Sequence, residues 1–129
     1  MAKDFYHDSL KYYHQMDKIK HFQDVILQFL NNYNEEMGGN LPDCIPERRI
    51  LADKENNSFQ LLSVGWKGNH YIFGPLFHFD IIEGKIWIQC NNTEREIVDE
   101  LMAQGIEKQE IVLGFVPPHA RHFLGFATA

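Results

Sequence analysis

Two short histidine motifs carry the side chains of this chain that are best suited to chemistry. His78 and Asp80 are two residues apart, so on a strand they share one face, and His119 and His122 follow two prolines. Imidazole and carboxylate are ordinary ligands for zinc and non-haem iron, and together they are also a candidate acid–base pair. However, Arg121 lies between the tail histidines, and two neighbours on a strand lack the orientation of a catalytic triad. We therefore expect local hydrogen bonds at both motifs and no metal ion.

Other catalytic patterns are weaker still. Asp80, Glu83 and Lys85 superficially resemble a nuclease motif, but Glu83 falls in a predicted turn and would not share a metal with Asp80. The sequence has no nucleophile-elbow serine, no P-loop and no dinucleotide-binding glycine motif. It therefore predicts a protein that is not an enzyme, with no catalytic, cofactor-binding or metal-binding residues. The alternative is a metal-dependent nuclease or hydrolase that uses His78, Asp80 and the tail histidines.

The surface around Trp87 favours a binding role. An indole beside Asp80, with His78 and Gln89 adjacent, has the aromatic and polar make-up of protein interfaces. The alternative is that a helix of the same chain covers Trp87 and makes it part of a second core layer. The tail from Val116 is apolar and aromatic, and we expect it to pack on its own domain or on a partner. The candidate interface residues are His78, Asp80, Trp87, Gln89, Pro117, Pro118, Arg121 and Phe123.

Composition limits the class of protein. The 129 residues suffice for one domain with a single core, and 44% of them are hydrophobic. A net charge of −6 argues against direct nucleic-acid binding by the chain alone, because phosphate binding needs a basic surface. Cys44 and Cys90 are too few and too far apart for a metal ribbon, so we expect free thiols, with one disulfide as the alternative. The chain shows no signal peptide and no long apolar run, which predicts a cytoplasmic protein without a membrane span.

The first half of the chain predicts one long helix. Apolar residues recur at three- and four-residue steps over 16–36, and Gly38-Gly39 supplies a stop. Residues 1–15 meet this spacing only in part and are interpreted as an N-terminal extension to a single domain over 16–129. Two prolines and two glycines predict a loop over 38–46.

The middle of the chain predicts an antiparallel meander. Turn residues separate strand-like runs, and Gly74-Pro75 suggests a bulge or bend in the third run, at an edge of the sheet. The four predicted strands cover about 47–53, 58–66, 70–82 and 85–90.

A two-residue turn at Glu83-Gly84 would set the register of the last hairpin. The facing pairs are then Ile82 with Lys85, Ile81 with Ile86, Asp80 with Trp87, Phe79 with Ile88, His78 with Gln89 and Phe77 with Cys90. One face is uniformly apolar and should be core, with Phe79 and Ile88 fully buried and Asp80 and Lys85 not. That face carries Phe77, Phe79, Ile81, Ile86, Ile88 and Cys90.

A second helix is predicted over 94–104. Thr93 and Glu96 fit a capping box at its start, and Gly105 suits the position after its end. A short buried strand follows over 111–115. The predicted buried stripe of the helix is Ile97, Val98, Leu101 and Met102. The whole is an α+β domain, in which a mostly antiparallel β-meander of four or more strands is packed by the long N-terminal helix and the second helix, with no parallel β-α-β unit.

Several separated segments form a recognisable series. They are Val64-Gly65-Trp66, Phe77-His78-Phe79-Asp80-Ile81, Gly84-Lys85-Ile86-Trp87-Ile88-Gln89, Asn92-Thr93-Glu94, Ile111-Val112-Leu113-Gly114-Phe115, Pro117-Pro118 and Gly125-Phe126-Ala127. In this order and spacing the chain resembles the XisI family, the fdxN-element excision controlling factors of cyanobacteria. The resemblance covers about residues 16–129. The chain departs from the family pattern at residues 1–15, at Cys90, where a polar residue is usual, and at Val116.

The resemblance implies a XisI-like fold and a function. It implies a non-enzymatic accessory or regulatory factor for developmentally controlled excision of a DNA element in heterocyst-forming cyanobacteria, with strand exchange left to a separate recombinase. XisI proteins are commonly encoded beside XisH, which resembles an endonuclease, so the resemblance also implies a XisH-like partner; antitoxin-like control of that partner is a variant of the same interpretation. No established catalytic residues carry over. From the aromatic surplus we further expect a homo-oligomer, most simply a homodimer, with the tail or the Trp87 surface in the contact.

Overall fold

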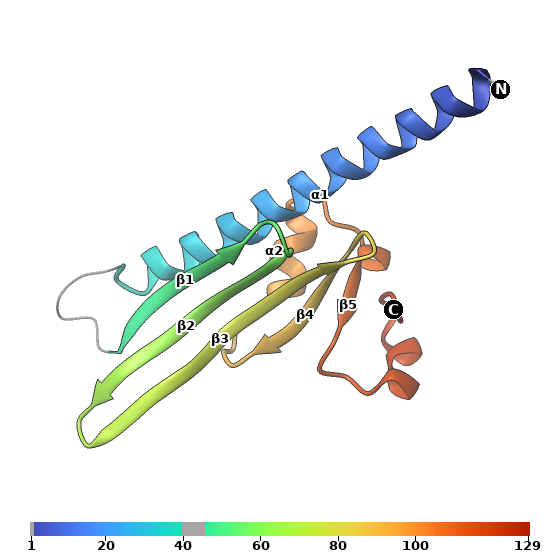
Figure 1. Ribbon diagram of the computed structural model, residues 1–129. Helices are drawn as coiled ribbons and strands as arrows, with labels where there is room; N and C mark the ends of the chain where they lie inside the picture. The colour runs from blue at the N-terminus through green and yellow to red at the C-terminus, as the bar shows by residue number, and fades with distance from the viewer. Residues whose placement is uncertain (1, 40–45) are drawn as a thin grey trace.

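The protein is a five-stranded sheet packed by helices. The computed structural model describes residues 2–39 and 46–129, with side chains from His14 onward. In chain order the elements are α1 (Ala2–Glu36), β1 (Glu47–Asp53), β2 (Ser58–Lys67), β3 (His70–Ile82), β4 (Lys85–Asn91), α2 (Ile97–Ala103), the 3₁₀ helix η1 (Lys108–Glu110), β5 (Ile111–Leu113) and the 3₁₀ helix η2 (Pro118–Leu124) (Figure 1). The strand order in the sheet is β1-β2-β3-β4-β5. The predicted α+β class and the meander of the first four strands are therefore confirmed.

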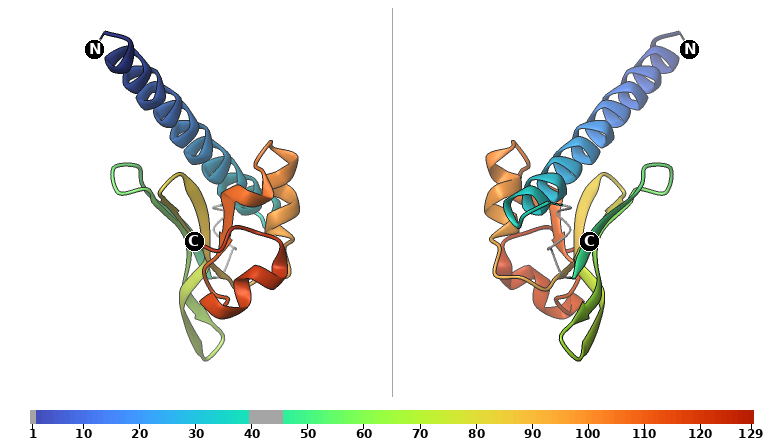
Figure 2. Two further views of the ribbon diagram at one scale, coloured as in Figure 1. Left: turned by 90° about the vertical axis from the view of Figure 1, so that its right-hand side faces the viewer. Right: turned by 90° about the vertical axis from the view of Figure 1, so that its left-hand side faces the viewer.

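The two α-helices lie on one side of the sheet (Figure 2). We call that side the inner face; it carries buried side chains such as Phe59, Phe79 and Ile88. The opposite side is called the open face, because within the described part of the chain no helix lies over β1–β3 there (Figure 2). Ser58 and Asp80 lie on it, since each is next in its strand to a phenylalanine buried on the inner face. No helix of the described residues is long and apolar enough to span a membrane.

Helix α1 confirms the predicted long helix and extends it towards the N-terminus. It runs without a break from Ala2 to Glu36, so residues 2–15 continue the same helix and project past the sheet (Figure 1). The predicted loop over 38–46, including Cys44, lies mostly outside the described residues. The buried stripe of α1 is Phe22, Val25, Ile26, Phe29, Leu30 and Tyr33.

Aromatic rings join α1 to the centre of the sheet. Phe29 meets Phe77 edge to face, with ring centroids 5.0 Å apart, and meets Phe79 in the same way at 5.7 Å. Tyr33 meets Phe77 at 4.8 Å. Edge-to-face pairs contribute about 0.5–1.5 kcal/mol beyond the burial of their area. This aromatic cluster fixes the position of α1 on β3, which carries the candidate site on its other face.

The β3–β4 hairpin follows the predicted register for four pairs and then departs from it. Glu83 and Gly84 both have positive φ, at 49° and 74°, as a two-residue type I′ turn requires. Phe79 pairs with Ile88 as predicted, but a bulge then shifts the register, so that the predicted pairs of His78 with Gln89 and of Phe77 with Cys90 are wrong. The observed pairs beyond the bulge are His78 with Cys90 and Phe77 with Asn91.

The bulge moves Cys90 off the apolar face. Because Cys90 pairs with His78, it lies on the open face, where it is half-buried and free. Its thiol lies 3.8 Å from the carbonyl oxygen of Pro75, and burial raises the pKa of the thiol. Cys90 is therefore the one residue that was wrongly predicted to lie on the apolar face. Phe79 and Ile88, which were predicted to be fully buried, are 0% and 1% exposed.

The third predicted strand bends where its sequence indicated. The β2–β3 register shifts between Leu61 and Leu62, so that Leu61 faces Phe77 whereas Leu62 faces Pro75. Pairing with β4 begins only at Phe77, so β3 is an edge strand before that point. The predicted bulge and edge position at Gly74-Pro75 are confirmed, and both follow from the missing N–H of proline.

The last strand corrects the expectation of a sheet without a parallel β-α-β unit. β5 pairs in parallel with β4, Ile86 lying opposite Ile111 and Ile88 opposite Leu113. Helix α2 crosses between the two strands and returns the chain to the same end of the sheet, which makes the pair parallel. β5 ends at Leu113, two residues before the predicted end.

Helix α2 begins three residues later than predicted. Its N-cap is Glu96, without a side-chain cap bond, so the predicted Thr93–Glu96 capping box is wrong. At its C-terminal end, Gly105 has a φ of 93° and bonds to Met102, and Ile106 bonds to Leu101, which completes the predicted C-terminal cap. Met102 is 37% exposed, contrary to the prediction, and Ile106 occupies the buried position instead.

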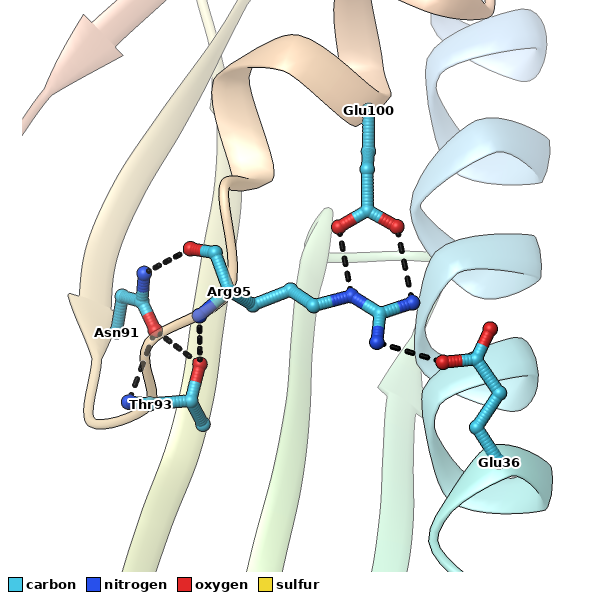
Figure 3. A network of polar contacts seen from close by, with 5 residues as sticks. All are labelled: Glu36, Asn91, Thr93, Arg95 and Glu100. Atoms are coloured by element: carbon cyan, nitrogen blue, oxygen red, sulfur yellow. Dashed lines mark hydrogen bonds and ion pairs between the residues drawn. The ribbon is translucent and has the colours of Figure 1, made fainter.

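The turn before α2 supports an arginine that joins the two helices (Figure 3). Asn91 Oδ1 accepts bonds from the backbone and hydroxyl of Thr93, whose Oγ1 accepts from the backbone of Arg95. This local bonding explains why Thr93 does not cap α2. The guanidinium of Arg95 then donates to both carboxylate oxygens of Glu100 and pairs with Glu36 of α1 at 2.6 Å. Hydrogen bonding from Arg95 lowers the pKa of Glu36.

Candidate partner interface

Polar side chains from three adjacent strands meet on the open face of the sheet. Ser58 Oγ donates to Asp80 Oδ1 at 2.8 Å, and Gln89 Nε2 donates to Asp80 Oδ2 at 3.2 Å. His78 Nε2 lies 3.0 Å from Asp80 Oδ1, and His78 Nδ1 lies 3.0 Å from Gln60 Oε1. The β2–β3 register places Ser58 opposite Asp80 and Gln60 opposite His78, which explains why they meet. We call these five residues the polar cluster.

Hydrogen bonds dominate the electrostatics of Asp80. Burial alone would raise the pKa of this carboxyl, but the bonds from Ser58, His78 and Gln89 outweigh that effect and lower it. Asp80 is therefore an anion at neutral pH, surrounded by donors. The two carboxylate oxygens are both engaged, so the cluster is a fixed polar surface on the sheet.

The cluster contains a serine, a histidine and an aspartate, but not in the order of a hydrolytic triad. In a triad the serine and the aspartate contact opposite ring nitrogens, so that the base is free to accept the hydroxyl proton. Here Ser58 Oγ and Asp80 Oδ1 both lie at His78 Nε2, at 3.2 Å and 3.0 Å, and the hydroxyl donates to the carboxylate. The other ring nitrogen faces Gln60. The arrangement suits recognition through fixed polar atoms better than nucleophilic attack.

A shallow hollow adjoins the polar cluster. It has a volume of about 440 Å³ and lies between β1 and β3 across β2. Leu51 and Asp53 of β1 border it on one side, and Ser58, Gln60 and His78 border it on the other. Leu51 is 48% exposed, so the hollow combines an apolar rim with polar groups, as the central parts of protein interfaces do.

Trp87 lies beyond the cluster, towards β5, and the tail of its own chain covers part of it. The guanidinium carbon of Arg121 lies 5.0 Å from the centre of the Trp87 ring. Arg121 is held there by backbone carbonyls, with Nε donating to Val116 at 2.9 Å and another nitrogen donating to Thr128 at 3.2 Å. Trp87 Nε1 is buried and has no hydrogen-bond partner within the described residues. The contact comes from the short helix η2 of the tail, so the alternative that a helix of the same chain covers Trp87 holds in part.

The tail folds back on the sheet and still exposes apolar rings. Pro117 and Pro118 begin η2, which ends at Leu124, and Ala127 then bridges to Val112 of β5. Ala127 is 6% exposed, whereas Phe123 is 78% exposed. Of the two alternatives for the tail, packing on its own domain or on a partner, the first holds for its end at Ala127. The ring of Phe123 stays exposed on the surface of the tail.

Comparison with known proteins decides the family. The model of the XisI family, described as XisI protein, matches residues 16–128. The chain belongs to the XisI family. Among solved structures it is similar to a XisI-like protein from Anabaena variabilis ATCC 29413, with 33% identity, a TM-score of 0.78, and coverage of 86% of this chain and 99% of that one.

A second solved structure from the same organism supports the XisI assignment. It is named fdxN element excision controlling factor XisI, is 31% identical, has a TM-score of 0.74, and matches 87% of this chain and 99% of its own. No curated protein matches the chain. The XisI fold therefore covers nearly the whole chain, including the polar cluster and the tail.

In this XisI chain the predicted interface residues fall into three groups. His78, Asp80 and Gln89 meet in the polar cluster. Trp87 and Arg121 stack on one another. The remaining three, Pro117, Pro118 and Phe123, lie on or beside η2. The candidate interface is thus a strip that runs from the open face over Trp87 to the tail.

The tail histidines do not complete a metal site with the cluster. His119 and His122 are both exposed on η2, where the ring of His122 lies 3.9 Å from that of Phe123. Among the described residues, no three histidine, cysteine, aspartate or glutamate side chains come together as metal ligands. The ring nitrogens of His78 already contact Gln60, Ser58 and Asp80. The geometry gives the metal-dependent alternative no support.

Sequence reasoning missed two members of the polar cluster and one exposed surface. Ser58 and Gln60 contact His78 across strands, and the β2–β3 register that aligns them is offset by a bulge. Predicting these contacts from the turn at 67–69 would have required knowing that a bulge interrupts the pairing of β2 with β3. The missed surface consists of Trp66, Tyr71 and Phe73, which are 61%, 56% and 67% exposed.

Proposed function

We propose that this protein is a non-enzymatic accessory factor in the controlled excision of a DNA element. It acts through contacts with a XisH-like protein in the cytoplasm. Membership of the XisI family supports the excision role, since one similar structure is named an fdxN element excision controlling factor. The mechanism rests on one observation, the uncovered polar cluster on the open face, where His78, Asp80 and Gln89 are fixed but not arranged for catalysis.

The polar cluster suits an interface because its side chains are already ordered. A partner that binds Asp80 or His78 meets groups that need not lose further side-chain freedom, which lowers the entropic cost of association. The exposed ring of Phe123 and the rim of Leu51 supply apolar contacts on either side. We further propose that the protein acts as a homodimer, with the domain formed by residues 16–129.

Co-purification tests the proposal. A tagged chain and the XisH-like protein of the same genome are co-expressed, and the complex is isolated by affinity and size-exclusion chromatography. We expect a stoichiometric complex that is weakened by His78→Ala with Gln89→Ala, and by Phe123→Asp. Asp24→Ala, an exposed change on α1, is the matched control and should leave the complex intact. Failure of the wild-type chain to retain the XisH-like protein would contradict the proposal.

Assays on the chain alone separate this function from the enzyme alternative. We expect no stoichiometric zinc or manganese after purification without added metal, and no hydrolysis of DNA. A metal that is retained by the chain and lost in His78→Ala would favour the enzyme instead. If the XisH-like protein is a nuclease, its activity with and without the chain decides whether the contact is antitoxin-like.

A further inference from the structure

The first part of β3 has a free backbone edge. β3 spans His70–Ile82, but β4 pairs only with Phe77–Ile82. Residues 70–74 pair with β2 on one side, and on the other side no strand of residues 2–39 or 46–129 accompanies them. Figure 1 shows the β2–β3 hairpin projecting beyond the end of β4. An unaccompanied edge presents backbone N–H and C=O groups that can pair with another strand.

This edge lacks the charged residues that usually block strand pairing. Of the two outermost strands, β1 carries Glu47, Arg48, Arg49 and Asp53 among its seven residues, and β5 is partly covered by the bridge from Ala127 to Val112. Residues 70–74 are His, Tyr, Ile, Phe and Gly, without a lysine, arginine, aspartate or glutamate. Proteins protect exposed edges with charge and proline, and here the first blocking residue is Pro75. The free edge over residues 70–74 is therefore unprotected and available for pairing with another strand.

Aromatic side chains on the same segment point to the same conclusion. Tyr71 pairs with Trp66 of β2, and their ring centroids are 5.2 Å apart on the open face. Phe73, on the same face, is 67% exposed. Three exposed aromatic rings on one hairpin form an apolar patch that the domain itself does not use, and such patches mark contact sites.

We propose that a second copy of this chain occupies this edge. Residues 70–74 of the two copies pair antiparallel about a two-fold axis and join the two sheets, and the inference rests on the homodimer included in the proposed function. With the axis at Ile72, Tyr71 of one copy lies opposite Phe73 of the other, so the seam consists of aromatic cross-strand pairs.

The self-complementary pairing of Tyr71 with Phe73 favours a second copy as the occupant, and the charge distribution permits it. Each chain carries a net charge of −6, so two copies repel unless they meet at an uncharged segment. Residues 70–74 are such an uncharged segment. The nearest charges on the open face, Glu47 and Arg49, have opposite signs and pair with each other at 3.0 Å. In a symmetric contact each copy therefore offers both signs, and no like charges are forced together.

Sedimentation velocity over a range of micromolar concentrations tests the contact. We expect the full chain to sediment as a dimer of the 15.1 kDa protomer. Tyr71→Lys with Phe73→Lys should weaken the dimer by at least about tenfold, because lysines on both strands repel across the seam. Phe115→Lys, a comparably exposed aromatic change outside the candidate interface, is the matched control and should leave the dimer unchanged. Circular dichroism and melting confirm that each variant folds.

Cross-linking places the axis independently. In a background with Cys44→Ser and Cys90→Ser, Ile72→Cys should form a disulfide-linked dimer, because directly opposed antiparallel residues are within reach of a disulfide. Val64→Cys lies on β2, one strand away from the seam, and should not form such a dimer. A monomeric wild-type chain, a dimer insensitive to Tyr71→Lys with Phe73→Lys, or a dimer lost with Phe115→Lys would overturn the proposal.

Capture of the XisH-like protein separates this inference from the proposed function. If the lysine variant is monomeric and still captures the XisH-like protein, the dimer contact and the partner contact are distinct, as we expect. If the dimer is seen but the partner is never captured, the proposed function fails and the dimer stands. If the wild-type chain is a monomer and the lysine variant loses the partner, the edge belongs to the XisH-like protein and the homodimer contact is refuted.

Discussion

Arg121 holds the tail of the chain against the ring of Trp87. Its guanidinium carbon lies 5.0 Å from the ring centre, and its nitrogens donate to the carbonyls of Val116 and Thr128, near the two ends of the tail. One side chain therefore connects both ends of this segment to the face of an indole on β4. In this XisI protein Arg121 thus acts together with the pairing of Ala127 on β5 to hold the tail on the sheet.

Replacing Arg121 by alanine should release the tail. The variant loses the cation–π contact and the charge-assisted bonds to the backbone, and we expect a destabilisation of about 1–3 kcal/mol. Proteolysis and hydrogen exchange should increase over residues 116–128, while β2 and β3 stay protected. The emission of Trp87 should shift to longer wavelength, measured with Trp66→Phe so that one tryptophan remains.

Arg121→Lys is the matched control for that experiment. Lysine keeps the charge but cannot reach several carbonyls from one planar group, so an intermediate effect is expected. Equal protection of the tail in the alanine variant and in the wild type would show that Phe126 and Ala127 hold the tail without Arg121.

The register of the β3–β4 hairpin predicts that substitutions at two of its positions differ widely in their effect on stability. Phe79 is 0% exposed on the inner face, and Phe79→Ala should cost about 3–5 kcal/mol in free energy of unfolding. Lys85 is half-buried at the turn, and Lys85→Ala should cost less than about 1 kcal/mol. Urea unfolding followed by far-UV circular dichroism measures both. Similar losses from the two substitutions would show that Phe79 does not lie in the core.

The same hairpin shows what the sequence was able to predict. Alternating apolar residues over 77–81 and 86–88 identify a buried face, and Glu83-Gly84 identifies a two-residue turn, because both signals depend on residues close in the chain. The long helix over 16–36 was predicted from spacing in the same way. The succession of these helical and strand-like patterns along the chain predicted the α+β arrangement, which the structure confirms.

The features that escaped prediction depend on contacts between distant residues or on one inserted residue. The bulge near Gln89 shifts the register by one residue, and no composition signal marks it. β5 is parallel to β4 because of where α2 crosses, which the three residues of β5 do not encode. Ser58 joined the candidate site through cross-strand pairing with Asp80, whereas His78 and Asp80 were recognised because their chemistry and spacing are local.

The polar cluster predicts a specific pH dependence. The pKa of Asp80 is lowered in the folded state below its ordinary value of 3.8, so its ionisation stabilises the fold at all pH values above that ordinary value. This stabilisation should disappear as the pH falls through the folded-state pKa. The free-energy difference between wild type and Asp80→Asn should therefore be constant above about pH 5 and shrink below about pH 4. Urea unfolding at a series of pH values measures it.

Removal of one donor provides the control for Asp80. Ser58→Ala deletes the 2.8 Å bond to Asp80 Oδ1 and should raise the pKa of Asp80, which carboxyl-carbon NMR titration detects directly. An unchanged titration in Ser58→Ala would mean that the hydroxyl is not bonded to Asp80 in solution.

Gly114 is required because Gln89 occupies the space beside it. A methyl group at Gly114 would collide with Gln89 Oε1 and would lie 3.3 Å from the carbonyl oxygen of Ile88. Gln89 is itself bonded to Asp80, so it cannot move aside without breaking that 3.2 Å contact. We expect Gly114→Ala to destabilise the protein by about 1–3 kcal/mol and to raise the pKa of Asp80.

A double-mutant cycle shows whether Gln89 is the cause of that cost. Gln89→Ala removes the obstructing amide, so Gly114→Ala should cost at least about 1 kcal/mol less in that background than in the wild type. The remaining cost then reflects the Ile88 carbonyl, partly offset by the lower chain entropy that alanine gives the unfolded state. Additive effects of the two substitutions would show that Gly114 is needed for its backbone alone. A coupling of this sign would show that the chain directly after β5 packs against the polar cluster through the side chain of Gln89.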